Sequence, residues 1–265
     1  MRLKTPISYY GGKQTMAKLI ISLIPEHRLY AEPFAGGLAV FWAKPPSLME
    51  VINDTNGSVV TFYQVLKSDF AILRHLIQQT PVSRKIHRQT DFILKYPEYH
   101  DKIKVAWAFW VQTNMSFGAK IGGGYGYGKT KPTQVSKIRN KKLQFGKHLC
   151  TRLENVDIEC NDAIKVIQSR DSEESFFYVD PPYYNADMGH YGGYTKADFT
   201  KLLDCLSQIK GKFLLSSYPS DLLTEYIDKH QWQVHEKQSK VAVTHLSSKD
   251  KIECLTANYN ILSLL

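Results

Sequence analysis

The chain has 265 residues, 43% of them hydrophobic, and a formal net charge of +9. It is long enough for one large domain or for a core with an inserted subdomain, and its apolar and aromatic content suffices for a packed core. No apolar run approaches membrane-spanning length, and the amino terminus lacks the apolar stretch of a signal peptide. The four cysteines are widely spaced, which favours neither a zinc cluster nor a disulfide framework, so we expect a cytoplasmic protein.

The first quarter of the chain predicts a nucleotide-binding half of the doubly wound type. A short buried strand at residues 28–33 runs into a glycine turn and a helix at 38–42. A second strand at 48–53 ends at Asp54, and the next helix has apolar residues at helical spacing, namely Val59, Phe62, Val65 and Leu66. Strand, glycine turn, helix, strand and acidic residue in this order are typical of that architecture.

The pattern changes from about residue 68 to 149, where no strand–helix alternation is visible. Helical segments around 72–77 and 105–111 lead into a glycine-rich loop at 122–128. We therefore expect an inserted, mostly helical subdomain at 68–149, and a catalytic core at 1–67 and 150–265.

Strand–helix alternation resumes after the insertion. Strands are predicted at 156–160, 176–179 and 212–216, and helices near 196–209 and 220–230. The tail at 232–264 resembles two further strands, with Ser247, Ser248, Lys249 and Asp250 as their turn. The expected fold class is α/β, with a doubly wound, Rossmann-like sheet.

The positive charge is concentrated in the insertion. No Asp or Glu occurs between Asp101 and Glu154, a window that holds eleven Lys and Arg residues. A run of charge often marks only a solvated surface, but more than fifty residues without an acid favour a segment that binds a polyanion.

The strand at 176–179 runs directly into Asp180, Pro181, Pro182 and Tyr183. This tetrapeptide suits methylation of a nucleobase amine, because the Asp180 carboxylate and the Pro181 carbonyl can accept both hydrogens of adenine N6. The lone pair of N6 would then point at a methyl donor, in a preorganised site that needs no metal. Consecutive prolines fix φ and add no competing N–H donor, and Tyr183 offers a ring face for an extruded base.

The alternative is that Asp180–Tyr183 is only a turn, since Pro-Pro and Asp-Pro are common in loops. An apolar strand that ends at the acid favours a site, because ligands of open α/β sheets bind beyond the carboxyl ends of strands.

Several residues are candidates for holding a cofactor. Gly36 and Gly37 would let a ligand approach a helix N-terminus, or would simply make a tight turn. Asp54 stands where an acid meets ribose hydroxyls in this architecture, although the missing G-x-G-x-x-G pattern argues against a dinucleotide. Asp162 can contact an adenine or cap a helix. Lys13 can neutralise a cofactor carboxylate or be a surface lysine.

Taken in order, these motifs resemble those of the Dam-type (D12 class) DNA adenine-N6 methyltransferases. The motifs are Tyr-Tyr-Gly-Gly-Lys at 9–13, Glu-Pro-Phe-Ala-Gly-Gly at 32–37, Asn-Asp at 53–54 and Asp-Pro-Pro-Tyr at 180–183. Residues 253–260 also resemble that class's closing strand. The acid-free insertion falls where the family places its target-recognition domain, so the resemblance covers nearly the whole chain.

The resemblance implies S-adenosylmethionine as the methyl donor and assigns the residues that would hold it. These residues are Tyr9, Tyr10, Gly11 and Lys13 in the amino-terminal motif, Phe34, Ala35 and Gly36 in the glycine loop, Asp54 at the ribose, Asp162 at the adenine, and Asp180 between cofactor and target base. The chain departs from the family at Ala163, where an aromatic residue is common, and at Tyr9, where relatives often have Trp.

The resemblance also implies a DNA-contacting hairpin at 114–120. The expected DNA-binding residues are Asn114, Ser116, Phe117, Lys120, Lys129, Lys131, Lys137, Arg139, Lys141 and Lys142. Phe117 either enters the duplex beside the flipped base or packs in the small core of the insertion. Residues 115–121 lack the arginine of GATC-reading relatives, so the resemblance does not extend to recognition of GATC.

We therefore expect a site-specific enzyme that methylates N6 of a flipped adenine in double-stranded DNA, encoded by a bacterium or a phage and associated with the nucleoid. The alternatives are methyl transfer to another amine, such as cytosine N4, RNA adenine or a protein amide, and a catalytically silent DNA-binding protein. An Asp at position 180, rather than Ser or Asn, favours adenine. The enzyme acts alone or as the modification half of a restriction system, in which a cognate restriction endonuclease acts separately.

Overall fold

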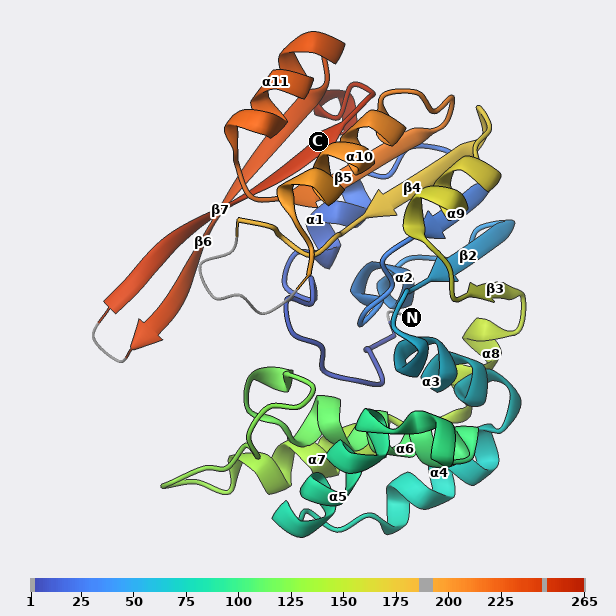
Figure 1. Cartoon of the computed structure of the whole chain (residues 1–265), viewed down its shortest axis with the longest axis vertical. Helices are drawn as coiled ribbons and strands as arrows, with labels where there is room; N and C mark the ends of the chain where they lie inside the picture. The colour runs from blue at the N-terminus through green and yellow to red at the C-terminus, as the bar shows by residue number, and fades with distance from the viewer. Residues whose placement is uncertain (1–2, 186–192, 245–246, 265) are drawn as a thin grey trace. The chain divides into compact units, whose positions relative to one another are not determined.

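The computed structural model describes residues 3–185, 193–244 and 247–264 (Figure 1). The chain forms two compact units. The first unit comprises Met1–Ile21, Ala35–Pro46 and Asp54–Cys160, and the second comprises Ser22–Phe34, Ser47–Asn53 and Asn161–Leu265. The predicted catalytic core at 1–67 and 150–265 and the predicted insertion at 68–149 have boundaries that differ from those of the two units. This functional division of the chain stays a prediction.

The sheet has seven strands in the order β3-β2-β1-β4-β5-β7-β6. The strands are β1 (Leu29–Glu32), β2 (Met49–Asn53), β3 (Val156–Glu159), β4 (Ser175–Val179), β5 (Lys212–Ser217), β6 (Gln233–Thr244) and β7 (Ser247–Ala257). The β2–β1, β1–β4 and β4–β5 pairs are parallel, whereas β7 pairs antiparallel with β5 and β6. This order matches a doubly wound sheet with an antiparallel edge, so the predicted fold class is confirmed.

In the second unit, three helices pack on one face of the sheet. They are α9 (Ala163–Ser169), α10 (Lys196–Leu206) and α11 (Asp221–His230). Phe177, Val179, Phe213 and Leu215 alternate along β4 and β5 and share a core with these helices. Period-two alternation places these side chains on one face, which fixes the register of the strands that carry the Asp180 motif.

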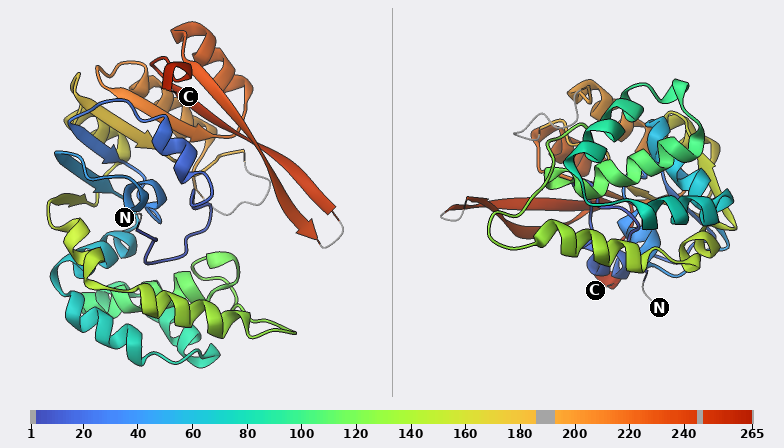
Figure 2. Two further views of the ribbon diagram at one scale, coloured as in Figure 1. Left: turned by 180° about the vertical axis from the view of Figure 1, so that it is seen from behind. Right: turned by 90° about the horizontal axis from the view of Figure 1, so that it is seen from below.

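The two carboxy-terminal strands form a long ribbon. β7 pairs with β5 only over Cys254–Ala257, and the rest of the β6–β7 ribbon projects from the sheet (Figure 2). The predicted turn at Ser247–Asp250 is wrong, because these residues belong to β7, where Asp250 pairs with Lys240. Ser, Lys and Asp favour turns locally, but cross-strand pairing decides here. Residues 245–246 lie outside the described part of the chain.

The first unit is mostly helical. Its helices are α1 (Ala17–Ser22, which ends one residue beyond the unit), α2 (Ala39–Ala43), α3 (Gly57–Ser68), α4 (Phe70–Gln79), α5 (Arg84–Lys95), η1 (Pro97–Tyr99), α6 (Lys102–Met115), η2 (Phe117–Ala119), α7 (Thr133–Gln144) and α8 (Lys147–Leu153). The short η3 (Leu262–Leu264) ends the second unit. α6 is the central helix, since it is buried along most of its length and packs against α3, α4, α5 and α7.

Residues 68–149 are mostly helical, and among the described residues their extended pairing is limited to one bridge between Ser116 and Tyr125. That this segment forms an inserted domain stays a prediction. None of the described helices is both long and apolar enough to cross a membrane.

Candidate active site

The Asp180 motif lies at the switch point of the sheet. β1 and β4 are adjacent parallel strands with Ala31 opposite Phe177, so the segments that follow Glu32 and Val179 leave the sheet at the same edge. Strand order reverses between these two strands, and doubly wound folds bind ligands at such a point. Asp180 comes directly after β4 and is half-buried.

The Tyr183 side chain is held at both ends. Its hydroxyl donates a short hydrogen bond to Glu253 Oε1 on β7 and lies 3.3 Å from Asp180 Oδ1. Its ring packs edge-on against Tyr218, with ring centroids 4.4 Å apart. Burial, together with the charges of Asp180 and Glu253, raises the pKa of Tyr183 well above its usual value. The hydroxyl therefore keeps its proton and acts as a donor.

Buried polar groups continue along this edge. Tyr30 donates a 2.7 Å hydrogen bond to Glu32 Oε1, and both side chains are buried. The Tyr178 hydroxyl oxygen lies 3.1 Å from Ser216 Oγ, within hydrogen-bond distance. Burial, and then the charge of Asp180, raises the pKa of Tyr178 well above its usual value. The edge therefore carries a cluster of buried or half-buried phenols and carboxylates.

In the first unit, Asp54 supports the glycine loop. Its Oδ2 accepts a 2.9 Å hydrogen bond from the Gly36 N–H, and its Oδ1 accepts one of 2.9 Å from the Asn56 N–H. Burial raises the pKa of Asp54, and these two N–H groups oppose that shift because they stabilise the carboxylate. Asn56 caps α3 by accepting from the Ser58 N–H, so helix capping does not account for Asp54.

The glycines of this loop make room for Tyr9. Gly36 has a φ of +45°, and a Cβ there would lie 2.9 Å from Tyr9 Cε1. A Cβ on Gly37 would lie 2.8 Å from Tyr9 Cβ. Tyr63 donates a 2.8 Å hydrogen bond to Gly36 O. The structure thus brings Tyr9, Gly36 and Asp54 together, and the close approach that needs glycine is made by a tyrosine of the predicted cofactor motif.

The remaining predicted cofactor residues differ in their surroundings. Lys13 is buried, with Nζ 3.3 Å from Gly11 O, so it is not a surface lysine. Asp162 is exposed and caps α9, accepting from Ile164 N–H at 2.9 Å and from Lys165 N–H at 3.2 Å. Its contact with a cofactor adenine stays a prediction, as do the roles of the half-buried Tyr10 and Phe34 and the buried Ala35.

The predicted DNA-contacting hairpin is a small bridged loop. Ser116 and Tyr125 form an antiparallel bridge, and Gly126 N–H donates to Met115 O at 2.8 Å. A Cβ on Gly126 would lie 3.2 Å from Met115 O, so the close pairing favours glycine there.

Residues of this hairpin differ sharply in exposure. Phe117 is 78% exposed, which excludes packing in the core of the insertion. Asn114 and Ser116 are buried. Asn114 Oδ1 accepts from Ser8 N–H at 3.1 Å, and Ser116 Oγ lies 2.8 Å from His87 Nε2. These two side chains anchor the hairpin, and their direct contact with DNA stays a prediction.

The family model described as D12 class N6 adenine-specific DNA methyltransferase matches residues 9–243. The chain belongs to this family. It is therefore an adenine-specific DNA methyltransferase, with DNA as its substrate and a methyl donor as its second reactant. The matched residues include both the insertion and the Asp180 motif, which confirms the resemblance seen in the sequence.

Other comparisons add little to the family assignment. Among solved structures, a precorrin-6y C5,15-methyltransferase from Geobacter metallireducens GS-15 aligns over 92% of this chain and 86% of that chain, with 10% identity and a TM-score of 0.37. That likeness is too distant to support a conclusion. No curated protein matches the chain.

The predicted DNA-binding cations of this D12 enzyme fall into two groups. Lys141 Nζ donates to Thr5 O at 2.7 Å, and burial lowers the pKa of Lys141 to about 8. Lys142 Nζ donates to Gln78 O at 2.9 Å and to Thr80 O at 2.5 Å. These two ammonium groups stabilise the unit itself. The cations exposed to solvent are Lys120, Lys129, Lys131 and Arg139, and Lys137 is half-buried.

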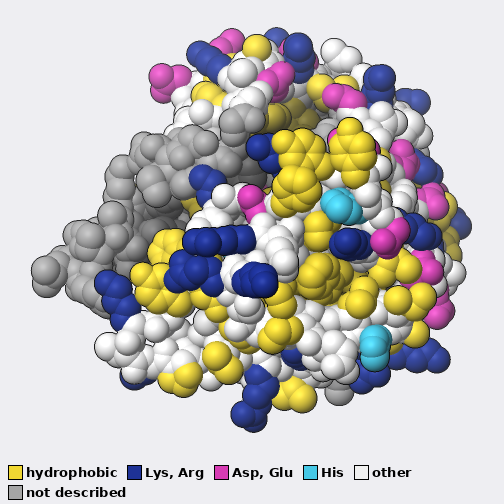
Figure 3. Space-filling view, turned by 60° about the horizontal axis from the view of Figure 1, so that its bottom comes forward, with side chains coloured by type: hydrophobic (Ala, Val, Ile, Leu, Met, Phe, Trp, Pro, Cys, Tyr) yellow, Lys and Arg dark blue, Asp and Glu magenta, His cyan; other side chains and the backbone are white. Residues whose placement is uncertain are grey.

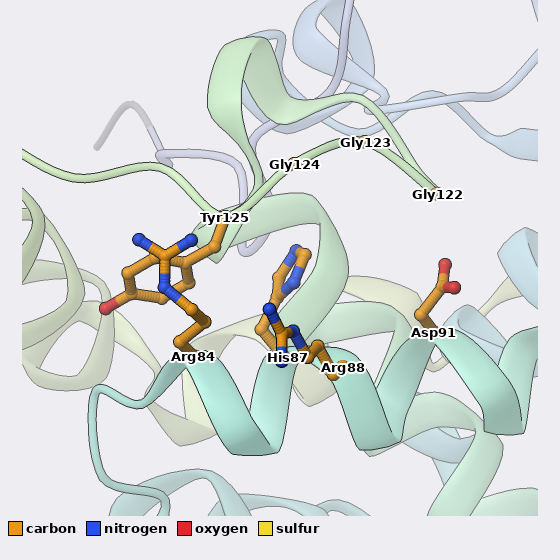
Figure 4. A pocket seen from close by; sticks show the side chains of 8 residues that line it. All are labelled: Arg84, His87, Arg88, Asp91, Gly122, Gly123, Gly124 and Tyr125. Atoms are coloured by element: carbon orange, nitrogen blue, oxygen red, sulfur yellow. The ribbon is translucent and has the colours of Figure 1, made fainter.

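The D12 enzyme has a cavity of about 240 Å³ between α5 and the glycine-rich loop (Figure 4). Arg84, His87, Arg88 and Asp91 line it from one face of α5, and Tyr125 closes it opposite. The Arg84 guanidinium lies 5.1 Å from the centre of the Tyr125 ring. Arg88 makes no hydrogen bond or ion pair with any described residue, so its donors are available to a ligand.

The sequence analysis did not identify these arginines as binding residues. It relied on the window without acidic residues between Asp101 and Glu154, and α5 lies before that window and contains Asp91. Helical spacing gave a signal, since positions 84, 87 and 88 lie on one face. Lys and Arg side chains gather beside hydrophobic ones in the left half of the face drawn in Figure 3. Glu253 was also missed as a site residue, and its apolar neighbours Ile252 and Cys254 were the available signal.

Proposed function

We propose that this D12 enzyme transfers a methyl group from S-adenosylmethionine to N6 of an adenine flipped out of duplex DNA, at a specific sequence. The observation that carries the proposal is the Asp180 motif at the carboxyl end of β4, with Tyr183 fixed by Glu253 and Tyr218. This arrangement offers a carboxylate, a carbonyl and an aromatic ring at one edge of the sheet.

The proposed chemistry uses two acceptors and one ring. Asp180 and the Pro181 carbonyl accept hydrogen bonds from the two N6 hydrogens, which directs the nitrogen lone pair away from the adenine ring system. S-adenosylmethionine supplies a methyl group whose carbon–sulfur electrons return to sulfur as the N–C bond forms. In this proposal Asp180 takes the proton that N6 releases, and Tyr183 stacks on the base. Groups preorganised for the transition state contribute most to rates of this kind.

Asp54 fits the ribose of such a cofactor. A carboxylate has about four lone-pair sites, and the two backbone N–H groups of Gly36 and Asn56 use only two. The other two are suited to ribose hydroxyls. Because these bonds form equally before and during methyl transfer, they contribute to cofactor affinity rather than to turnover.

The variant Asp54→Ala tests this assignment. It should weaken binding of S-adenosylhomocysteine by roughly tenfold to a hundredfold, the value of hydrogen bonds to a charged group. Titration calorimetry measures the affinity directly, and Asp157→Ala, at an acid in β3, is the control. An unchanged affinity would leave Asp54 with only its structural bond to the glycine loop.

The proposed DNA-binding surface includes the hairpin and the α5 cavity. The exposed Phe117 fills the space left by the flipped base, and Arg84 and Arg88 bind backbone phosphate beside it. Arginine suits phosphate because its planar fork of donors matches two oxygens. The exposed cations Lys120, Lys129, Lys131 and Arg139 extend this surface.

A methyl-transfer assay tests the proposed function. Tritiated S-adenosylmethionine is incubated with unmethylated duplex DNA, with RNA of matching sequence, and with DNA lacking adenine. We expect label only in adenine-containing DNA, and label in RNA or in adenine-free DNA would contradict the proposal.

We further propose a bacterial or phage enzyme that acts at the nucleoid in the cytoplasm, alone or beside a cognate restriction endonuclease.

A further inference from the structure

A hydrogen-bond network of four buried side chains includes His87, which also lines the α5 cavity. His87 Nε2 lies 2.8 Å from Ser116 Oγ. Gln112 donates through Nε2 to His87 O at 2.6 Å and to Thr90 Oγ1 at 3.1 Å, and its Oε1 accepts from Ser116 Oγ at 3.2 Å. The network thus joins α5 to the end of α6, where the hairpin begins.

The network determines which hydrogens its members carry. A backbone carbonyl only accepts, so the amide nitrogen of Gln112 faces His87 O and the amide oxygen faces Ser116. The one hydroxyl hydrogen of Ser116 then goes to Gln112, which leaves Ser116 Oγ as an acceptor toward His87. His87 therefore carries a hydrogen on Nε2 whether its ring is neutral or charged.

The other ring nitrogen of His87 is left for a ligand in the cavity. Nδ1 forms no hydrogen bond with any residue that the structure describes, and it is not among the enclosed polar atoms of that part of the chain. A neutral ring offers a lone pair at Nδ1, and a charged ring offers a second N–H donor. Only the charged ring suits a ligand that has acceptors alone, as a DNA phosphate does.

The groups that surround the imidazole favour an anion as that ligand. Arg84 and Arg88 line the same cavity from α5 (Figure 4). Asp91 is the acid of the lining, and it is exposed, so solvent and salt screen its charge. From the loop, Tyr125 faces the imidazole with ring centroids 5.7 Å apart, and residues 122–124 are uncharged glycines. Two guanidinium groups against one carboxylate leave the lining positive.

The charge of the ring depends on what occupies the cavity. Burial lowers the pKa of His87 below its usual value, the charge of Asp91 opposes this shift, and that of Arg84 adds to it. The ring of the free enzyme is therefore mostly neutral at neutral pH. A phosphate beside it would favour the charged ring and raise its pKa. Binding of the phosphate and binding of a proton then strengthen each other.

We propose that His87 is a third ligand of the DNA phosphate that Arg84 and Arg88 bind, and that it takes up a proton from solvent when the phosphate enters the cavity. Nδ1–H then donates to a phosphate oxygen, while Nε2–H keeps its bond to Ser116 and holds the hairpin that carries Phe117. The inference rests on the phosphate contact proposed above, and it adds a residue that ties this contact to the hairpin.

Binding of the full-length enzyme to unmethylated duplex DNA tests the proposal. Between about pH 8 and about pH 5.5, the affinity of the wild-type enzyme should rise about tenfold more than that of His87→Gln, the gain that a rise of one in the pKa of the ring gives. Gln keeps an N–H donor for Ser116 and does not titrate. His75→Gln, at an exposed histidine of α4, is the matched control and should keep the wild-type pH dependence.

Calorimetry in buffers of different ionisation enthalpy counts the protons directly, and the wild-type enzyme should take up more than His87→Gln. Equal pH dependence or equal proton uptake for these two enzymes overturns the proposal. If His87→Gln does not fold, a wild-type enzyme that takes up no proton on binding DNA overturns it. A wild-type enzyme that methylates DNA adenine, and an Arg88→Gln variant that binds DNA more weakly, preserve the proposed function in each of these outcomes.

Discussion

The edge of the sheet that carries Asp180 and the hairpin that carries Phe117 are built in opposite ways. At the edge, the polar side chains are buried or half-buried, and some are bonded to residues distant in the sequence, as Tyr183 is to Glu253 and Tyr178 is to Ser216. In the hairpin, Phe117 is exposed. The hairpin is anchored by the hydrogen bond between two buried side chains, Ser116 and His87.

This contrast follows from the two tasks. Transfer of a methyl group requires a fixed geometry, because a small displacement of an oriented group lowers the rate sharply. Contact with DNA requires side chains that protrude from a supported loop. Substitutions at the edge should therefore change turnover, and substitutions in the hairpin and along α5 should change the response to DNA structure and salt.

The largest effect is expected at the edge. Asp180→Ala should lower methyl transfer by about 10²-fold or more, because it removes a group that acts in the transition state. The fold should persist, since Asp180 is half-buried and lies beyond the end of β4. Steady-state kinetics with tritiated cofactor measure the loss, and unchanged DNA affinity is the control. Near-normal turnover in a folded variant would refute the mechanism.

In the hairpin, Phe117→Ala should discriminate between substrates. Its turnover should fall about tenfold more on duplex DNA than on DNA whose target adenine is mismatched, because an unpaired base has already met part of the extrusion cost of about a few kcal/mol. Tyr127→Ala, at another exposed aromatic residue of the loop, is the comparison. Equal losses on both substrates would mean that Phe117 does not act in base flipping.

A smaller effect is expected along α5. Arg88→Gln should weaken binding to every DNA sequence and reduce the slope of log affinity against log salt by roughly 0.9, the contribution of one phosphate contact. Lys142→Met should instead lower thermal stability and keep that slope, because its ammonium group is bonded to Gln78 O and Thr80 O. Fluorescence anisotropy at several salt concentrations separates the two, and an unchanged slope for Arg88→Gln would exclude the phosphate contact.

Much of the fold could be predicted because its signals are local. Val59, Phe62, Val65 and Leu66 recur at helical spacing and are all buried in α3. The apolar strand before Asp180 likewise became β4. The turn at Ser247–Asp250 was mispredicted because its composition resembles a turn, whereas pairing along the ribbon decides its structure.

The site could be predicted only where a motif is contiguous. Asp180–Tyr183 is such a motif, but the partner of Tyr183 lies 70 residues away on β7. Lys141 was assigned to DNA by its charge, which stays a prediction, but the bond of its ammonium group to Thr5 O, 136 residues away, could not be predicted. Long-range contacts of this kind leave no periodic pattern in the sequence.

Identification of the methylated base tests the central claim most directly. Duplex DNA is incubated with S-adenosylmethionine and either the wild-type enzyme or Asp180→Ala, digested to nucleosides, and analysed by mass spectrometry. The account predicts N6-methyladenine as the methylated nucleoside with the wild-type enzyme, and a level near background with the variant. N4-methylcytosine as the product, or equal N6-methyladenine from both enzymes, would contradict it.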